Sequence, residues 1–202
     1  MLKLGFLASG NGSSLRAIVA AIEAGDLDGE ARLVVSNRRE APALAFAREH
    51  RIATMHIPTA VDPAGADARL TGAMTDAGAD TIVLSGYLRR LGPVTLAAFE
   101  GRILNIHPAL LPAHGGEGYY GRRVHESVIA AGDRISGATV HLVDGEYDHG
   151  AILAQARLEL APGETAESLE RRVMALEPGL FVETLRRMAT AASSSRISDN
   201  IS

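Results

Sequence analysis

Short apolar runs alternate with segments of helical periodicity along most of the chain, and this alternation restricts the fold more than any other sequence feature. Short, largely apolar runs are typical of strands buried on both faces, and amphipathic segments between them are typical of helices covering a parallel sheet. The runs that we expect to form strands are Leu2–Ala8, Ala31–Ser36, Thr54–Ile57, Thr81–Ser85 and Arg102–Ile106. The segments that we expect to form helices are Leu15–Ala24, Ala41–His50, 66–77 and Pro93–Phe99.

The pattern changes after residue 106. Val124–Ala131 and Glu164–Ala189 have helical periodicity, whereas Gly137–Val143 and Ala151–Leu160 follow each other as two strands. Because no helix separates these strands, we expect an antiparallel pair at the sheet edge. The sequence therefore predicts an α/β protein with a Rossmann-like open sheet, mostly parallel with an antiparallel C-terminal strand pair, and helices on both faces.

Composition predicts one domain that acts on small molecules. A chain of 202 residues with 47% hydrophobic content can bury one substantial core, which we expect over residues 1–190. Residues 191–202 are polar and lack periodicity, so we expect a disordered tail there. The net charge of −4 does not favour nucleic acid as a partner. The sequence does not fix the oligomeric state, and a homodimer is one option.

The sequence lacks cysteine and lacks a signal or membrane-spanning segment, which limits the possible catalytic groups and the expected cellular location. The chain has no cysteine, which excludes a thiol nucleophile and cysteine-ligated metals. The apolar stretch at the N-terminus breaks into Gly and Ser after Ala8, too early for a signal peptide, and no later run is long enough to span a bilayer. We therefore expect a soluble protein of the cytoplasm.

A glycine-rich turn, Ser9-Gly10-Asn11-Gly12-Ser13-Ser14, lies between the first expected strand and its helix. Backbone N–H groups and the helix dipole converge on such a turn, so Gly12, Ser13 and Ser14 are predicted to bind a phosphate. A dinucleotide site would need a third glycine where Leu15 stands, and NAD is not expected. The alternative is a tight turn in which Ser13 only caps the helix.

Asn105 and His107 lie at the end of an expected strand, followed by Pro108. Residues two apart in a strand point to the same face, so both side chains should lie on one side while Ile106 packs on the other. An amide can donate to an oxyanion, and an imidazole can exchange a proton near neutral pH. This arrangement favours acyl transfer, although His107 could instead be a structural histidine at a strand end.

Asp148 lies in the loop between the last two expected strands, where its carboxylate could pair with an imidazolium or hold a water. Asp144, in the same loop, is by default a solvated charge. His107, His141 and His149 lack the spacing of a known zinc motif, so we expect no metal.

These motifs resemble those of the folate-dependent formyltransferases. The resemblance rests on GNGSSL after the first strand, on Ile103 to Pro112 (ILNIHPALLP), and on the pattern H-x-V-x4-D-x-G-x-I-x2-Q from His141 to Gln155. It covers about residues 2 to 189. It implies that 10-formyltetrahydrofolate, as co-substrate and without a metal, donates a formyl group to the amine of 5-phosphoribosylglycinamide in de novo purine biosynthesis.

The resemblance also implies roles for individual residues. The catalytic residues would be Asn105, which contacts the formyl oxygen, His107, the general acid, and Asp148, which supports it. The glycine-rich turn would hold the phosphate of the ribonucleotide, and Glu177 its ribose hydroxyls. The folate pocket would be lined by Leu88, Arg89, Arg90, Leu91 and Asn105 and closed by the loop Asp144–Asp148.

Two segments depart from the family pattern. Residues 113–123 are longer and richer in glycine than in many members, and we interpret them as a mobile lid whose Tyr119, Tyr120, Arg122 and Arg123 could contact substrate. The family uses an arginine after the third strand, and Pro58–Ala66 contains none.

Three other functions stay open at this point. A related hydrolase releases formate from 10-formyltetrahydrofolate and usually has an additional N-terminal regulatory domain. Methionyl-tRNA formyltransferase has an additional basic C-terminal domain, for which we see no counterpart after residue 189. A non-catalytic nucleotide-binding module would keep only the phosphate site.

Overall fold

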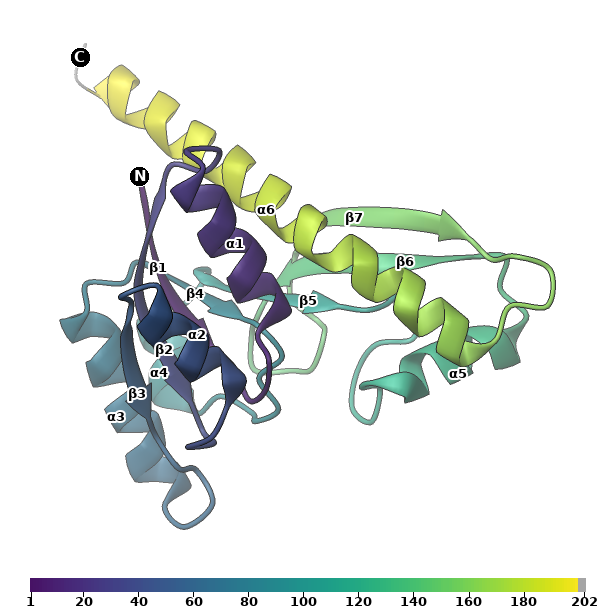
Figure 1. Ribbon diagram of the computed structural model, residues 1–202, viewed down its shortest axis with the longest axis horizontal. Coiled ribbons are helices and arrows are strands. Elements are labelled where there is room, and N and C mark those ends of the chain that lie inside the picture. Colours follow the sequence, from purple (N-terminus) through teal and green to yellow (C-terminus); the bar gives the residue numbers. More distant parts are fainter. Residues whose placement is uncertain (200–202) are drawn as a thin grey trace.

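A computed structural model describes the backbone of residues 1–199 and the side chains of residues 1–191. Its seven strands form one sheet with the order β3-β2-β1-β4-β5-β6-β7 (Figure 1). The strands are β1 (Leu2–Leu7), β2 (Gly29–Ser36), β3 (Ala53–His56), β4 (Thr81–Leu84), β5 (Ile103–His107), β6 (Ile135–Leu142) and β7 (Ile152–Glu159). The helices are α1 (Ser13–Glu23), α2 (Pro42–Glu49), α3 (Pro63–Asp76), α4 (Pro93–Ala98), α5 (Arg122–Ala131) and α6 (Ala166–Asp199).

The sheet is parallel from β3 to β5, and β6 runs antiparallel to both of its neighbours. The antiparallel C-terminal pair expected from the sequence is therefore confirmed. The reversal also pairs β6 with β5, which the sequence pattern does not specify. Asn105 on β5 lies opposite His141 on β6, and His107 lies opposite Thr139.

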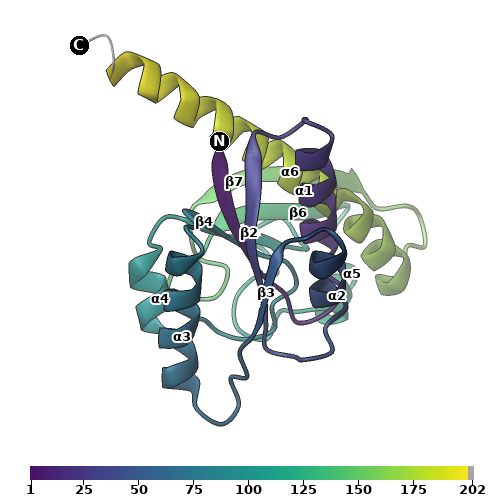
Figure 2. The same cartoon turned by 60° about the vertical axis from the view of Figure 1, so that its left-hand side comes forward.

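The two faces of the sheet are covered by different helices (Figure 2). On β1, Leu4 and Phe6 join one core cluster with residues of α1, α2 and α6, whereas Leu7 joins a second cluster with residues of α3 and α4. Because successive side chains of a strand point to opposite faces, this split fixes the orientation of each strand. Helices on both faces are confirmed.

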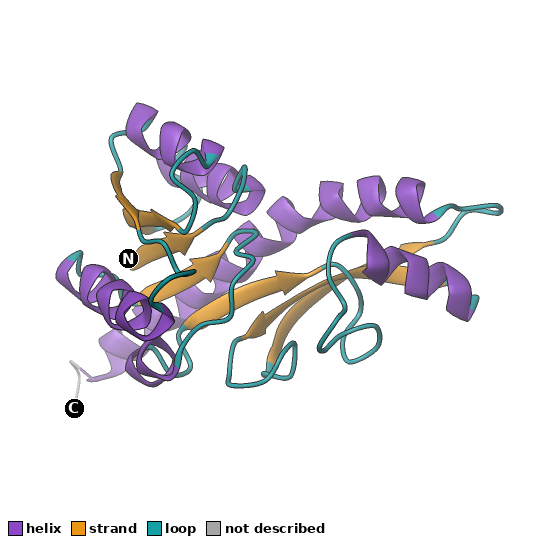
Figure 3. Cartoon of the chain, turned by 90° about the horizontal axis from the view of Figure 1, so that it is seen from below, coloured by secondary structure: helices purple, strands orange, loops and turns teal. Residues whose placement is uncertain are grey.

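The α3/α4 face is covered differently beyond β5, and this is where the polar residues collect. Ile103 packs in the α3/α4 cluster, so the alternation along β5 places Asn105 and His107 on that face, whereas Ile106 packs on the other. Figure 3 shows the loops that follow β5 and β6 on the side of these strands away from α6. The chain can therefore bring loop residues onto Asn105 and His107.

Two helix boundaries differ from the sequence expectation. Helix α3 begins at Pro63, earlier than the expected residue 66, because the Asp62 carboxylate accepts a hydrogen bond from the Gly65 amide and caps the helix. Helix α6 continues to Asp199, so the segment 191–202, expected to be a disordered tail, overlaps its end. The alanines at 191 and 192 favour the helix. Residues 200–202 lie outside the described part of the chain.

The buried Asp67 carboxylate joins α3 to α4. It accepts hydrogen bonds from the backbone N–H groups of Val94 and Thr95, at 2.9 and 3.1 Å, and from the Thr95 hydroxyl at 2.5 Å. These donors belong to the first turn of α4, whose N-cap, Gly92, has no side chain to supply a cap. Asp67 therefore caps a neighbouring helix and fixes the end of the segment that follows β4.

We expect Asp67→Ala to lower the free energy of unfolding by roughly 2–4 kcal/mol, because it leaves the buried Thr95 amide and the partly buried Val94 amide without an acceptor and removes the 2.5 Å hydrogen bond of the Thr95 hydroxyl. Urea denaturation measures the loss. Asp62→Ala, which removes an exposed cap, is the matched control with an expected loss of about 1 kcal/mol. Equal losses in the two variants would contradict this role for Asp67.

Candidate active site

The ends of β5 and β6 place an amide and two imidazoles side by side. The Asn105 Nδ2 atom lies 3.2 Å from Nε2 of His141, the residue opposite it in the sheet. His141 is 2% exposed and His107 is 3% exposed, so these rings lie in a low-dielectric environment. The expectation that Asn105 and His107 share one face is confirmed.

Asp148 lies against the His107 ring, as the sequence analysis requires. Its Oδ2 atom is 3.2 Å from His107 Nδ1, and its side chain is 11% exposed. The other ring nitrogen, Nε2, lies 2.8 Å from the carbonyl oxygen of His114, which can only accept a hydrogen bond. The proton of neutral His107 is therefore assigned to Nε2, and a second proton at Nδ1 would face the Asp148 carboxylate.

Backbone geometry holds Asp148 in place. Its φ of 54° is in the left-handed region, which Asp tolerates better than most residues. Its Oδ2 also accepts a hydrogen bond from the Gly116 amide at 3.1 Å, and a Cβ on Gly115 would lie 3.3 Å from the Asp148 Cβ and 2.3 Å from the Leu111 side chain. The 113–116 segment therefore contacts both members of the His107–Asp148 pair through its backbone.

The two partners shift each other's protonation in opposite senses. Burial lowers the pKa of His107, and the nearby Asp148 carboxylate opposes that shift. For Asp148, burial acts to raise the pKa, but hydrogen bonding to His141, the charge of His107 and the Gly116 amide outweigh it and leave the pKa below its ordinary value. Asp148 is thus an anion at neutral pH, poised to stabilise a proton on His107.

His141 fixes the orientation of the Asn105 amide. The His141 Nδ1 atom lies 2.8 Å from the Leu142 carbonyl oxygen and donates to it. In the neutral ring Nε2 accepts one Asn105 N–H, whereas in the protonated ring Nε2 donates to Asp148 Oδ1, 3.5 Å away. The second N–H of the Asn105 amide remains for another acceptor. The sequence analysis considered His141 only as a zinc ligand. The pairing of β5 with β6 would have identified it, because that register places it opposite Asn105.

A cleft of about 110 Å³ opens beside this cluster. Its lining includes most of the residues predicted for the folate pocket, namely Arg89, Arg90, Leu91, Asn105, Asp144 and Asp148. Leu88 is not among the lining residues and is 65% exposed. His107 is not among them either, because the 113–116 segment and Asp148 cover its ring.

Asp144 shapes the loop that bounds the cleft. Its carboxylate accepts a hydrogen bond from the Glu146 amide at 2.8 Å and lies 2.9 Å from His149 Nδ1. These contacts lower the pKa of Asp144 despite the opposing effect of burial, and the pairing raises that of His149. Asp144 therefore stabilises a turn within the loop.

The glycine-rich turn after β1 offers unpaired backbone donors. Gly12 is the N-cap of α1 with a φ of 69°, and the Leu15 amide donates to Ser85 Oγ at 3.0 Å. Within residues 1–199, the amides of Ser13 and Ser14 have no hydrogen-bond partner. The Ser13 side chain makes no capping hydrogen bond, so the alternative role of Ser13 as a simple cap is not what the structure shows. The turn presents N–H groups at a helix N-terminus, the geometry that binds anions.

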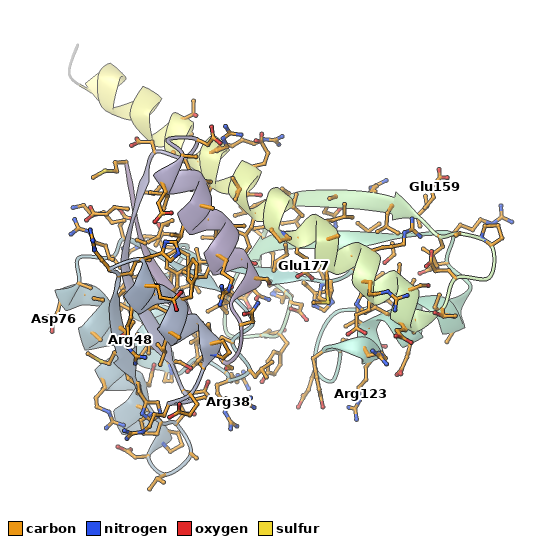
Figure 4. All side chains as sticks on the ribbon, viewed as in Figure 1. Arg38, Arg48, Asp76, Arg123, Glu159 and Glu177 are labelled. Carbon is orange, nitrogen blue, oxygen red and sulfur yellow. The ribbon has the colours of Figure 1, made fainter. Side chains whose placement is uncertain are left out.

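Glu177 lies on α6 where this helix passes α1 (Figure 4). Burial raises its pKa to about 7. In the part of the chain that the structure describes, no side chain or amide hydrogen-bonds to its carboxylate. A half-buried carboxylate of this kind is a good acceptor for hydroxyl groups of a ligand. Within residues 1–191, no hydrogen bond or ion pair joins Glu177 to Asn105, His107, His141 or Asp148.

The expected lid residues have defined positions. Arg122 and Arg123 form the first turn of α5 and are not in a loop. Arg122 pairs with Glu170 of α6, and Arg123 lies over the ring of Tyr120 and points away from the sheet (Figure 4). Tyr119 and Tyr120 are exposed. Mobility of this segment stays a prediction.

Thr139 and Gln155 organise the backbone that follows His107. Thr139 Oγ1 donates to the Ala109 carbonyl, and the Gln155 amide donates to the Leu111 carbonyl. Sequence analysis used Gln155 only as part of a motif, and Thr139 carried no signal. Within the described residues, no group of His, Asp and Glu side chains is arranged to hold a metal ion, and no helix is long and apolar enough to cross a membrane.

We expect Asp148→Asn to lower the pKa of His107 further, because it removes the carboxylate charge that opposes the effect of burial. NMR titration of the imidazole resonances measures this shift. Asp26→Asn removes the same charge at an exposed site and should leave the His107 titration unchanged. An unchanged or higher His107 pKa in Asp148→Asn would contradict the pairing.

Comparison with known proteins relates this geometry to a family. A family model described as formyl transferase matches residues 2–185. A chloroplastic phosphoribosylglycinamide formyltransferase from Vigna unguiculata is 41% identical over 92% of this chain and 60% of its own length. The phosphoribosylglycinamide formyltransferase of Escherichia coli is 36% identical over 87% of this chain and 81% of its own length.

A solved structure agrees with these relatives. Glycinamide ribonucleotide transformylase 1 from Symbiobacterium toebii superposes with a TM-score of 0.87 at 35% identity, covering 95% of this chain and 89% of that chain. The present chain spans 60% and 64% of the length of two plant relatives, from Vigna unguiculata and Arabidopsis thaliana. The family match covers every strand of the sheet and also Asn105, His107, His141 and Asp148, and on this basis the chain belongs to the formyl transferase family.

Proposed function

We propose that this protein transfers the formyl group of 10-formyltetrahydrofolate to the amine of 5-phosphoribosylglycinamide, a step of de novo purine biosynthesis. The observation that carries the proposal is the His107–Asp148 pair with the Asn105 amide beside it, at one wall of a cleft. An oxyanion donor, a proton donor and a supporting carboxylate are what formyl transfer to an amine requires. The names of the relatives support this choice of substrates.

The donor occupies the cleft in this proposal. Leu91 is buried, and Arg89 and Arg90 supply positive charge at the cleft. A flat pterin fits between the segment after β4 and the 144–148 segment, and the acidic tail of the folate is attracted by Arg89. Leu88 lies outside the cleft lining and is left at its rim.

The ribonucleotide lies on the other side of Asn105 and His107. Its phosphate accepts hydrogen bonds from the Ser13 and Ser14 amides, next to Gly12, at the positive end of α1. Glu177 accepts hydrogen bonds from the ribose hydroxyls.

Chemistry begins when the neutral amine attacks the formyl carbon. The second N–H of the Asn105 amide donates to the oxygen that becomes negative, and protonated His107 stabilises the same oxyanion. His107 Nε2 is bonded to the His114 carbonyl, so we propose that the 113–116 segment moves off this atom when both substrates bind.

Collapse of the tetrahedral intermediate breaks the bond between the formyl carbon and N10. The attacking nitrogen loses a proton and N10 gains one, so the products are the formamide and tetrahydrofolate. Burial lowers the pKa of His107, so the protonated ring releases its proton readily. The Asp148 carboxylate stabilises the ring when it takes up a proton again. This relay uses groups that the chain itself supplies.

The organisation around this reaction is also part of the proposal. We propose one catalytic domain over residues 1–190 that works in the cytoplasm on small molecules. The net charge of −4 supports small-molecule substrates over nucleic acid. A homodimer would leave this mechanism unchanged, because its residues all come from one chain.

We expect His107→Ala and Asn105→Ala each to lower kcat by about 10²–10³, the usual cost of removing one oxyanion donor. Steady-state assays with purified variants and both substrates measure this loss, and circular dichroism confirms that they fold. His50→Ala is the matched control, because His50 is paired with Glu23 at the surface. Near-normal turnover by folded His107→Ala would sink the proposed mechanism.

A direct assay separates transfer from the alternatives. Purified protein is mixed with 10-formyltetrahydrofolate, with and without 5-phosphoribosylglycinamide, and loss of the formyl donor is followed. We expect amine-dependent loss. Release of formate without the amine would identify a hydrolase, and binding of the ribonucleotide without turnover would identify a non-catalytic module.

We expect Glu177→Gln to stabilise the fold and weaken ribonucleotide binding. Burial raises the Glu177 pKa from 4.5 to about 7, so the charged form costs stability. Between pH 4.5 and about 7 the folded protein keeps the Glu177 proton that the unfolded chain has already released, so the free energy of unfolding falls as the pH rises through this range. At about pH 4 the carboxyl is protonated in both states, and the stability that it contributes there is fully present. Glu177→Gln should therefore gain roughly 1–3 kcal/mol at pH 8 and nothing at pH 4.

The same variant tests the role of the carboxylate in binding. Calorimetric titration with 5-phosphoribosylglycinamide between about pH 6 and pH 8 (about one pH unit to either side of 7) should show affinity rising with pH in the wild type, relative to Glu177→Gln. Glu183→Gln, on the exposed side of α6, is the control for both measurements. If the affinity for 5-phosphoribosylglycinamide changed with pH in the same way in wild type and Glu177→Gln, the proposed contact between Glu177 and the ribose would be ruled out.

A further inference from the structure

Arg90 connects the two segments that face each other across the cleft. Its Nη2 donates to the Gly145 carbonyl oxygen at 2.5 Å, and its guanidinium carbon lies 5.4 Å from the centre of the Tyr147 ring. Gly145 and Tyr147 belong to the 144–148 segment. Arg90 belongs to the segment after β4, which comprises residues 85–92. All three residues line the cleft.

The planar guanidinium is suited to this double contact. Its edge presents N–H groups to a carbonyl, while its face stacks on an aromatic ring. Tyr147 is 49% exposed, and among the side chains of residues 1–191 its ring has no hydrogen bond and no other aromatic or cation–π contact. The neighbouring Arg89 has no hydrogen bond or ion pair within residues 1–191, which leaves its charge available to an anionic ligand.

The 144–148 segment needs such an attachment. Asp144 bonds to Glu146 and His149, which shapes the turn but does not tie it to the rest of the molecule. At its end, Asp148 is fixed by His107 and by the Gly116 amide. Arg90 supplies an attachment in the middle of the segment, at Gly145 and Tyr147.

We propose that Arg90 is a positioning residue that holds the 144–148 segment against the segment after β4. It thereby sets the width of the cleft for the flat ring of the donor. The kinetic part of this inference rests on the proposed function. The attachment itself does not, and it can be tested separately.

Three variants test the proposal. Arg90→Met keeps the aliphatic stem and removes the guanidinium, and Arg90→Lys restores the charge and one hydrogen bond without the planar face. Arg102→Met is the matched control. Arg102 makes the same kinds of contact elsewhere, donating to the Asp80 and Ala98 carbonyl oxygens and lying 5.1 Å from the centre of the Phe99 ring.

Amide hydrogen exchange of residues 144–148 is measured in the whole protein without substrates. We expect exchange about five- to tenfold faster in Arg90→Met than in wild type, the effect of losing one charged hydrogen bond and one exposed cation–π contact. Arg90→Lys should lie between the two. Arg102→Met should stay within about twofold of wild type, because its contacts are remote from the segment.

Kinetics of the same variants test the consequence. In Arg90→Met we expect the KM for the formyl donor to rise about tenfold and the KM for the amine substrate to change less than about twofold, with partial recovery in Arg90→Lys. A higher donor KM with unchanged exchange would mean that Arg90 binds the donor directly, which overturns the proposal. Unchanged exchange and unchanged KM would overturn it as well. If wild-type protein transfers no formyl group, the proposed function fails, and the exchange comparison still decides whether Arg90 holds the segment.

Discussion

The antiparallel pairing of β5 with β6 is the constraint on which the site depends. In a fully parallel sheet, neighbouring strands contribute to a site mainly through the loops at their carboxyl ends. Reversal of β6 instead places side chains from the bodies of two strands opposite each other, Asn105 against His141 and His107 against Thr139. It also sends the connection from β6 to β7 back over the face of β5. Asp148 can therefore approach within 3.2 Å of His107 although it lies far away in sequence.

Burial strengthens the electrostatic interaction between His107 and Asp148, and it also makes any unpaired polar atom in the site unfavourable. An imidazole that is 3% exposed resists protonation, so the Asp148 carboxylate has a large influence on whether His107 carries a charge. The backbone of the 113–116 segment supplies hydrogen bonds to both buried groups, because the His114 carbonyl accepts from His107 Nε2 and the Gly116 amide donates to Asp148. Any displacement of this segment changes the hydrogen bonds of both His107 and Asp148. The conformation of the loop and the proton affinity of the pair are therefore coupled.

The hydrophobic periodicity of the sequence predicts the features that depend on local backbone geometry, such as the face to which a side chain points and the start of a helix. The alternation along β5 places Asn105 and His107 on one face and Ile106 on the other, and Pro93 begins a helix as expected. Strand order is not encoded in such periods, so the position of His141 opposite Asn105 could not be read from the sequence. The left-handed backbone at Asp148 and the cap that Asp67 gives to another helix depend on tertiary contacts in the same way. The burial of Glu177 is equally hidden, because a lone glutamate in an amphipathic helix normally faces solvent.

The glycine-rich turn and the cleft are parts of one rigid arrangement at the point where the strand order reverses, between β1 and β4. Ser85, at the end of β4, accepts the Leu15 amide of α1, and Ser9, at the end of β1, accepts the Leu88 amide of the segment after β4. Both serines are buried, and the hydrogen bond between Leu15 and Ser85 is shielded from bulk water. The two bonds connect the glycine-rich turn with the segment after β4, which forms a wall of the cleft. The scaffold thus fixes the spacing of the two proposed substrate sites, whereas the 113–116 and 144–148 segments reach the cleft and Asp148 as loops between elements of the scaffold.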